Sequence, residues 1–219
     1  MFEFGPDVGI EFTESASGHV ANGISDPQEA ERIGISQGSS FQFSLQVSIP
    51  RLETFLASTA HVAQIRGGTV SWKPNITAVP LSPGGNLTLF RKADATRTRK
   101  FVDFAFAFAD PGRLFSCTGV KDLQDDNGLD ASTDLSTIYV TLQADNQFAA
   151  SGVARANLLD FVRQLQSCRV TGAKSETEEN AARAAFLGFM NAELREVYPG
   201  LPLLFEDSTR FTAEQRRTL

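Results

Sequence analysis

The chain has 219 residues, and 20 Lys and Arg against 26 Asp and Glu give a formal net charge of −6 and a sequence pI near 5.0. This acidic balance excludes a large phosphate-binding face, because such affinity comes from rows of Lys and Arg that release counterions. We therefore expect no nucleic-acid partner. The sequence shows neither a basic leader with an apolar run nor the roughly 18 apolar residues of a membrane-spanning helix. We expect a cytoplasmic protein without a membrane span.

Strand patterns dominate the first half of the chain. Residues 41–49 alternate large apolar side chains with Gln and Ser, which predicts a strand with one buried face that ends at Pro50. A helix is predicted over residues 51–64, where apolar residues recur at helical spacing before a Gly pair. Shorter strands are predicted at residues 9–14, 69–72 and 86–91.

The second half contains a predicted hairpin. Residues 104–109 alternate Phe with Ala, and Asp110-Pro111-Gly112 is a turn sequence, so residues 114–120 should return as an antiparallel partner. Further strands are predicted at residues 137–143 and 152–156, and helices at 158–168 and 175–197. The last helix begins with a capping box at Ser175-Glu176-Thr177-Glu178.

These elements predict a mainly β (α+β) fold, an antiparallel β-sandwich or barrel with two short helices and a longer C-terminal helix. We expect residues 1–174 to form the β domain, and 175–219 to be a helix and tail that dock on it or form a homodimer contact. The helical patterns at 52–56 and 158–162 each follow a strand and precede Gly. An internal duplication of residues 9–92 and 100–174 is one interpretation, and chance similarity is the other.

Familiar catalytic motifs are missing from the sequence. It has no dinucleotide-binding glycine fingerprint, phosphate-binding loop or nucleophile elbow, so we predict no cofactor. His19 and His61 have no metal-ligating residue at ligand spacing, and each is either an ordinary residue or a lone general base. Cys117 and Cys168 are predicted to be buried thiols rather than a disulfide.

An acidic stretch follows the predicted hairpin. Asp125, Asp126, Asp130 and Asp134 surround Gly128, and carboxylates are preferred calcium ligands. The stretch does not match an EF-hand loop, because Leu123 takes the first ligand position. We keep two interpretations, a calcium site of another kind and a solvated connection built on Asn-Gly.

Rows of Phe give the main indication of a ligand. Phe residues recur on alternating strand positions at Phe41, Phe43, Phe104, Phe106 and Phe108. Such rows form either a filled core or a space for an apolar ligand. The basic residues Arg91, Lys92, Arg97, Arg99 and Lys100 form either a solvated loop or a contact for phospholipid or an acidic partner.

Several motifs resemble a known family. The residues are Asp103-Phe104-Ala105-Phe106, Gly119-Val120-Lys121, Asp125-Asp126, Gly128, Asp130, Asp134 and Thr137-Ile138-Tyr139-Val140. In this order they resemble an extra segment of some bacterial sterol-oxidase-like flavoproteins of the glucose-methanol-choline family and of related lipid-acting multidomain proteins. The chain departs from that pattern at Ala131-Ser132, where an aromatic residue is expected. The resemblance implies a setting in lipid metabolism, with a lipid-acting enzyme as partner, and carries over no catalytic residue.

Three functions follow from these observations. The first is a non-catalytic module that binds an apolar, lipid-like or sterol-like ligand or a partner protein. The second is a cofactor-free isomerase or cyclase that works in a barrel mouth with one of His19, His61, Glu11 and Glu14 as acid or base. Glu11 and Glu14 cannot act as a pair, since their odd spacing puts them on opposite strand faces. The third is a calcium-assisted membrane-surface module.

Overall fold

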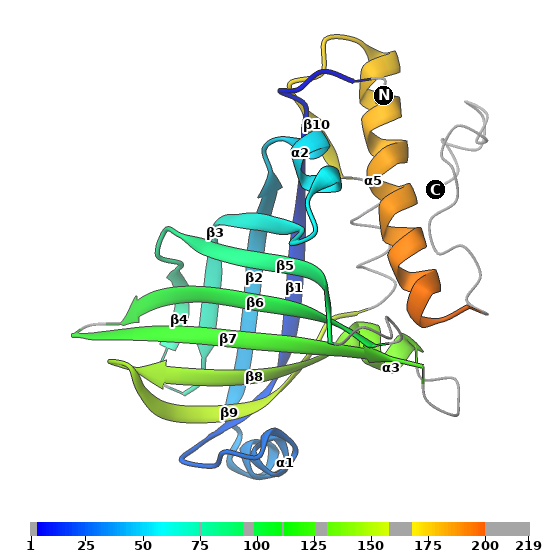
Figure 1. Cartoon of the computed structure of the whole chain (residues 1–219). Coiled ribbons are helices and arrows are strands. Elements are labelled where there is room, and N and C mark those ends of the chain that lie inside the picture. Colours follow the sequence, from blue (N-terminus) through cyan, green and yellow to red (C-terminus); the bar gives the residue numbers. More distant parts are fainter. Residues whose placement is uncertain are drawn as a thin grey trace, which may run out of the picture.

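The computed structural model describes residues 4–74, 76–93, 99–110, 112–125, 131–157 and 168–199. Its strands form one antiparallel sheet in the order β10-β1-β2-β3-β5-β6-β7-β8-β9, with β4 on β3. Because β9 also pairs with β1, eight strands close into a barrel, and β4 and β10 extend it (Figure 1). The predicted mainly β fold is confirmed, as a barrel. The strands are β1 (Gly9–Asn22), β2 (Ser40–Ile49), β3 (Val62–Trp72), β4 (Ile76–Pro80), β5 (Gly85–Lys92), β6 (Arg99–Asp110), β7 (Arg113–Gln124), β8 (Thr137–Ala144), β9 (Gln147–Arg155) and β10 (Arg169–Thr171).

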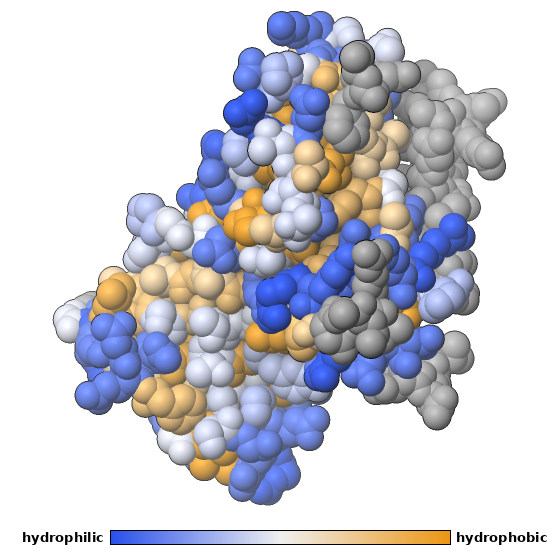
Figure 2. Space-filling view, viewed as in Figure 1, coloured by the Kyte–Doolittle hydropathy of each residue, from blue (hydrophilic) through white to orange (hydrophobic). Residues whose placement is uncertain are grey.

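The apolar residues of the alternating strand patterns face the barrel interior. The apolar row of β2 pairs in register with the interior rows of β1 and β3, for example Phe43 with Ala16 and with Val70. The predicted hairpin is present, since β6 and β7 pair from Arg99↔Gln124 to Asp110↔Arg113. Outside the barrel, the alternate residues of β6 include half-buried alanines, and Figure 2 shows apolar surface over this strand.

Four helices are described: α1 (Pro27–Gln37), α2 (Leu52–Ala57), α3 (Ala131–Ser136) and α5 (Glu176–Val197). The capping box of α5 is present, because the Ser175 side chain accepts a hydrogen bond from the Glu178 amide at 3.2 Å. Helix α1 was not predicted from the sequence. Its signals are an Asp26 cap, which accepts from the Glu29 amide at 2.7 Å, and Gly38 with a φ of 66° at its end.

The helix predicted over 51–64 is wrong beyond Ala57. Ser58 has extended backbone angles, and its hydroxyl accepts a hydrogen bond from the Ala60 amide at 3.1 Å, which turns the chain away from the helix. Val62 then starts β3, whose pairing with β2 and β5 overrides the helical spacing. Residues 158–167 of the other short predicted helix lie outside the described residues, and the duplication stays a prediction.

The two ends of the barrel differ. At one end α5 lies against the strands (Figure 1) and inserts aromatic side chains, so that Phe186 is 5.9 Å from Phe12 and Phe189 is 5.8 Å from Phe90 between ring centroids. We call this the sealed end. At the other end β6 turns into β7 and β8 into β9, and we call it the open end. None of the described helices is long and apolar enough to cross a bilayer.

The helix α1 packs beside the open end, against β1 and β9, with hydrophilic residues over its outer side (Figures 1 and 2). It approaches β1 closely at Gly34, where a Cβ atom would lie 2.6 Å from the Val20 carbonyl oxygen. Only Gly allows this contact, which holds the end of α1 beside the first residues of β2.

Candidate functional site

A cleft of about 650 Å³ opens at the open end of the barrel. Its lining comes from the ends of β1, β3, β6 and β8, the starts of β7 and β9, and the end of α1. Because antiparallel strands bring these termini together, residues far apart in the sequence meet here. They are Asn22, Gln37, Ser39, Trp72, Pro74, Ile76, Asp110, Arg113, Phe115, Ala144, Gln147, Phe148 and Ala149.

Aromatic rings form one wall of the cleft. Phe115 stacks on Phe108 of the barrel interior, with ring centroids 5.2 Å apart and an interplanar angle of 10°. Trp72 meets Phe115 edge-on at 5.9 Å, and its indole nitrogen donates to the Ser39 hydroxyl at 3.3 Å. The hydrogen bond and the stacking hold both rings in fixed orientations. The wall is therefore rigid, and its two rings stand nearly perpendicular to each other, at 82°.

Apolar side chains remain exposed around the cleft. Phe148 lines it with 45% of its surface exposed, and Leu114, 54% exposed, lies nearby on the opposite face of β7 from the lining residues Arg113 and Phe115. Exposed large apolar side chains that gather at a concave surface are typical of an interaction site. They make this cleft the strongest candidate for binding an apolar group.

Charged groups lie at the rim. The Arg113 guanidinium is 5.7 Å from the centroid of the Phe115 ring, and its Nε is 3.5 Å from an Asp145 carboxylate oxygen. Arg113 and Asp145 are both exposed, so this ion pair is weak and leaves the guanidinium available to a ligand. Asp110 adds a carboxylate on the other side of the turn.

The Phe residues predicted to bind a ligand lie inside the barrel. Phe41, Phe43, Phe104, Phe106 and Phe108 are all at most 4% exposed. Phe43 packs on Phe104 and Phe106 at 6.1 Å and 5.4 Å, as in a packed core. Phe108 reaches the cleft through its stack with Phe115. The rings that line the cleft, Trp72, Phe115 and Phe148, were missed, although Phe115 follows the Asp-Pro-Gly turn and Trp72 ends a predicted strand.

The sealed end holds a small cavity instead of a cleft. It measures about 20 Å³, room for about one water molecule, and is lined mainly by apolar residues of the barrel and by Met190 of α5. Phe104 is the one predicted ligand residue that lines it. Glu14 and Lys121 also face it and form an ion pair of 2.8 Å, with both side chains 3% exposed.

A second buried cation attaches α5 to the sealed end. Lys100 is fully buried, and its Nζ contacts the carboxylates of Glu193 at 2.6 Å and Glu196 at 2.8 Å and the Glu193 carbonyl at 3.1 Å. Lys100, predicted to belong to a basic surface cluster, therefore faces inward. The other described members are exposed, and Arg91 pairs with Asp103 and Arg99 with Asp122 across neighbouring strands.

The predicted calcium ligands are only partly described. Asp126 and Asp130 lie outside the described residues, and Asp125 is exposed. Asp134 lies in α3, where its Oδ2 accepts from the Tyr198 hydroxyl at 2.6 Å and from the Gln124 amide at 3.3 Å. Within the described part of the chain, no three His, Cys, Asp or Glu side chains are grouped to hold a metal ion. Asp134 has a structural role, since it fastens the end of α5, and the calcium site stays a prediction.

The histidines and cysteines have structural surroundings. His19 Nδ1 is 3.1 Å from the Ser39 carbonyl, and the His61 ring lies 4.6 Å from Phe189. Burial lowers the pKa of His61, partly opposed by the nearby Glu193 carboxylate. Cys117 and Cys168 are free and buried, as predicted, and burial raises the pKa of both thiols, which makes them poor nucleophiles.

Comparisons with known proteins give no family. No protein-family description, no curated protein and no solved structure matches the chain. The resemblance to sterol-oxidase-like proteins therefore stays a prediction, and the cleft is interpreted from its own geometry.

Proposed function

We propose that the protein is a non-catalytic binding module that takes the apolar part of a small molecule into the cleft at the open end. The observation that carries the proposal is the wall of Trp72 and Phe115 beside an exposed Phe148, in a cleft of about 650 Å³. This volume is within the range of about 300 to 1,000 Å³ typical of small-molecule sites. A lipid-like or sterol-like molecule is the proposed class, with its polar group near Arg113.

The position of Trp72 makes the proposal directly testable. The chain contains a single Trp and two Tyr, so Trp fluorescence, excited selectively, reports on this cleft. Titration with a naphthalene-sulfonate dye, a fatty acid and a sterol should give saturable quenching or energy transfer from Trp72. A signal that rises linearly with ligand, or none with all three probes, would contradict the proposal.

A pair of variants at exposed apolar positions provides the control. Phe148→Ser should weaken binding about tenfold, because it removes an aromatic contact worth roughly 1.5 kcal/mol. Val62→Ser removes another exposed apolar side chain, at the start of β3 and far from the cleft lining, and should leave affinity unchanged. Equal effects of the two variants would indicate nonspecific adsorption.

A cofactor-free isomerase or cyclase is the second proposal. It is favoured by Glu14 and Lys121, which place an acid and a base at an apolar cavity. The cavity holds about one water, so substrate would have to displace part of α5. Proton NMR of a β,γ-unsaturated ketone should show isomerisation that Glu14→Gln abolishes while Trp72 titrations stay unchanged. Unchanged turnover in this variant would remove the proposal.

A further inference from the structure

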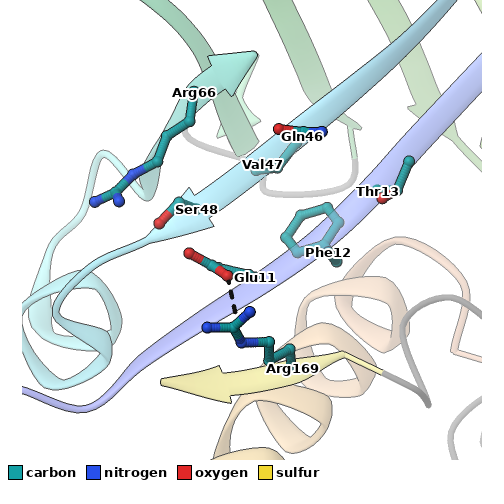
Figure 3. A pocket seen from close by; sticks show the side chains of 8 residues that line it. All are labelled: Glu11, Phe12, Thr13, Gln46, Val47, Ser48, Arg66 and Arg169. Carbon is teal, nitrogen blue, oxygen red and sulfur yellow. Dashed lines mark ion pairs between the residues drawn. The ribbon is translucent and has the colours of Figure 1, made fainter. Parts of the chain in front are cut away.

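A second surface groove lies on β1, β2, β3 and β10, toward the sealed end of the barrel. It measures about 470 Å³ and is lined by Glu11, Phe12, Thr13, Gln46, Val47, Ser48, Arg66 and Arg169. Figure 3 shows Arg66 and Arg169 on opposite sides of the Ser48 hydroxyl and the Glu11 carboxylate. None of these residues lines the cleft at the open end.

A β-bulge places Arg66 over the groove. Gln46 pairs with Gly67 and Val47 with Ile65, so Arg66 is the extra residue of β3 and has no partner in β2. The neighbouring Gly68 has a φ of 140°, and a Cβ there would lie 2.0 Å from the Ser44 carbonyl oxygen, so the bulge requires Gly. Bulges redirect side chains and are frequent beside functional sites.

The polar groups of the groove are not used by the fold. The exposed Arg66 makes no ion pair or hydrogen bond with a described residue, and neither does the hydroxyl of Ser48, which opens onto the groove. Both side chains line the groove, so these polar groups are accessible to a ligand there. Arg169 is held only loosely, with its Nε 3.7 Å from Glu11 Oε2.

We propose that this groove binds an oxyanion, a phosphate or carboxylate group of a small molecule. Arg66 and Arg169 would contact it through their guanidinium forks, and Ser48 would donate its hydroxyl hydrogen. Glu11 is the only carboxylate among the eight lining residues, so the lining has a net charge of +1. Glu11 orients Arg169 and repels the ligand, which limits affinity.

The test uses the intact protein and follows each arginine through its own NMR signal. Inorganic phosphate, and separately acetate, is titrated at constant ionic strength while the Nε–Hε signals of the arginines and the amide of Ser48 are followed by NMR. The proposal expects saturable shifts at Arg66, Arg169 and Ser48. Shifts that stay linear with both anions, or equal shifts at the exposed Arg32 of α1, would overturn it.

Three variants test the roles of the residues. Arg66→Met should weaken binding at least tenfold, since it removes a charge-assisted contact, and its exposed position keeps folding intact. Glu11→Gln should tighten binding severalfold, because it removes the repulsion. Arg32→Met, which changes net charge equally, should have no effect. If Arg32→Met weakens binding as much as Arg66→Met, the anion is held only by general surface charge and the proposal fails.

A vesicle experiment identifies the source of the oxyanion. Phosphatidylcholine vesicles with phosphatidic acid are compared with vesicles without it. Binding that needs phosphatidic acid and is lost in Arg66→Met assigns a lipid headgroup. Phosphate binding without vesicle binding assigns a soluble compound. Trp72 fluorescence should not change with phosphate, so failure here and failure of the cleft proposal can be told apart.

Discussion

The two ends of the barrel are built from the same strands but differ in what those strands bury and expose. At the sealed end the strands bury charge: Lys100 is buried against α5, and the Glu14–Lys121 pair lines a cavity of about 20 Å³. At the open end they leave apolar side chains exposed around a cleft of about 650 Å³. The difference shows that α5 closes the barrel interior at one end, while the other end keeps a cleft. Buried charge marks the closed end and exposed aromatic surface marks the available one.

The strongest test of this comparison removes one charge from the sealed end. Lys121→Met leaves Glu14 buried without its partner and should lower the free energy of unfolding by about 3 to 5 kcal/mol. The double variant Glu14→Leu with Lys121→Met removes both charges and should recover most of the loss. Urea denaturation measures both. An equally unstable double variant would mean that packing, and not the unpaired charge, dominates.

A second test loosens α5. Lys100→Met removes the buried contacts to Glu193 and Glu196 and should cost about 2 kcal/mol, because hydrogen bonds to charged groups are worth about 1.5 to 3 kcal/mol. Hydrogen exchange should speed up in α5 more than in the strands of the open end. Lys92→Met, at an exposed position of β5, is the control and should change neither quantity.

The open end should tolerate change. Phe148→Ser removes an exposed ring and should alter the free energy of unfolding by no more than about 0.5 kcal/mol, as surface substitutions do. Thermal and urea denaturation would check this. A large loss of stability would show that Phe148 is part of the core and would weaken the contrast between the two ends.

The smallest expected effect is a pH dependence at the sealed end. The pKa of His61 is lowered in the folded state, so the unfolded chain binds its proton more readily. Stability from neutral His61 is complete above its ordinary pKa of 6.5 and declines as the pH falls below that value. His61→Asn, which suits the φ of 44° at this position, should flatten the fall in the urea midpoint between pH 7.5 and 5.5. An identical slope in both proteins would contradict this.

The alternation of apolar and polar residues made most strands predictable. Pairing between segments distant in the sequence decided the secondary structure elsewhere. The rows that contain Phe43 and Phe106 face the interior as their spacing indicates. The start of β3, Val62 to Gln64, was predicted as the end of a helix because its pairing with β2 and β5 leaves no local signal, whereas its end at 69–72 was predicted as strand. Helix α1 did have local signals at Asp26 and Gly38, and they were overlooked.

The candidate site was less predictable than the fold. Glu14 follows Ile10 and Phe12 on the inward face of β1, and this inward position of a charged residue was a readable sign of a buried partner. That the partner is Lys121, 107 positions away, depends on barrel closure. The contact between Trp72 and Phe115 also depends on barrel closure, since the strand order fixes which turns surround the cleft.

The strand β1 also sets how the chain must fold. It pairs with β2 along most of its length, with β10 at one end and with β9 at the other, where Ser17 meets Arg155. During synthesis, β1 must wait until β9 has emerged before the ring can close. Because contacts between such distant segments are slow to form, folding should be limited by this last pairing, with one side of β1 open to wrong partners until then.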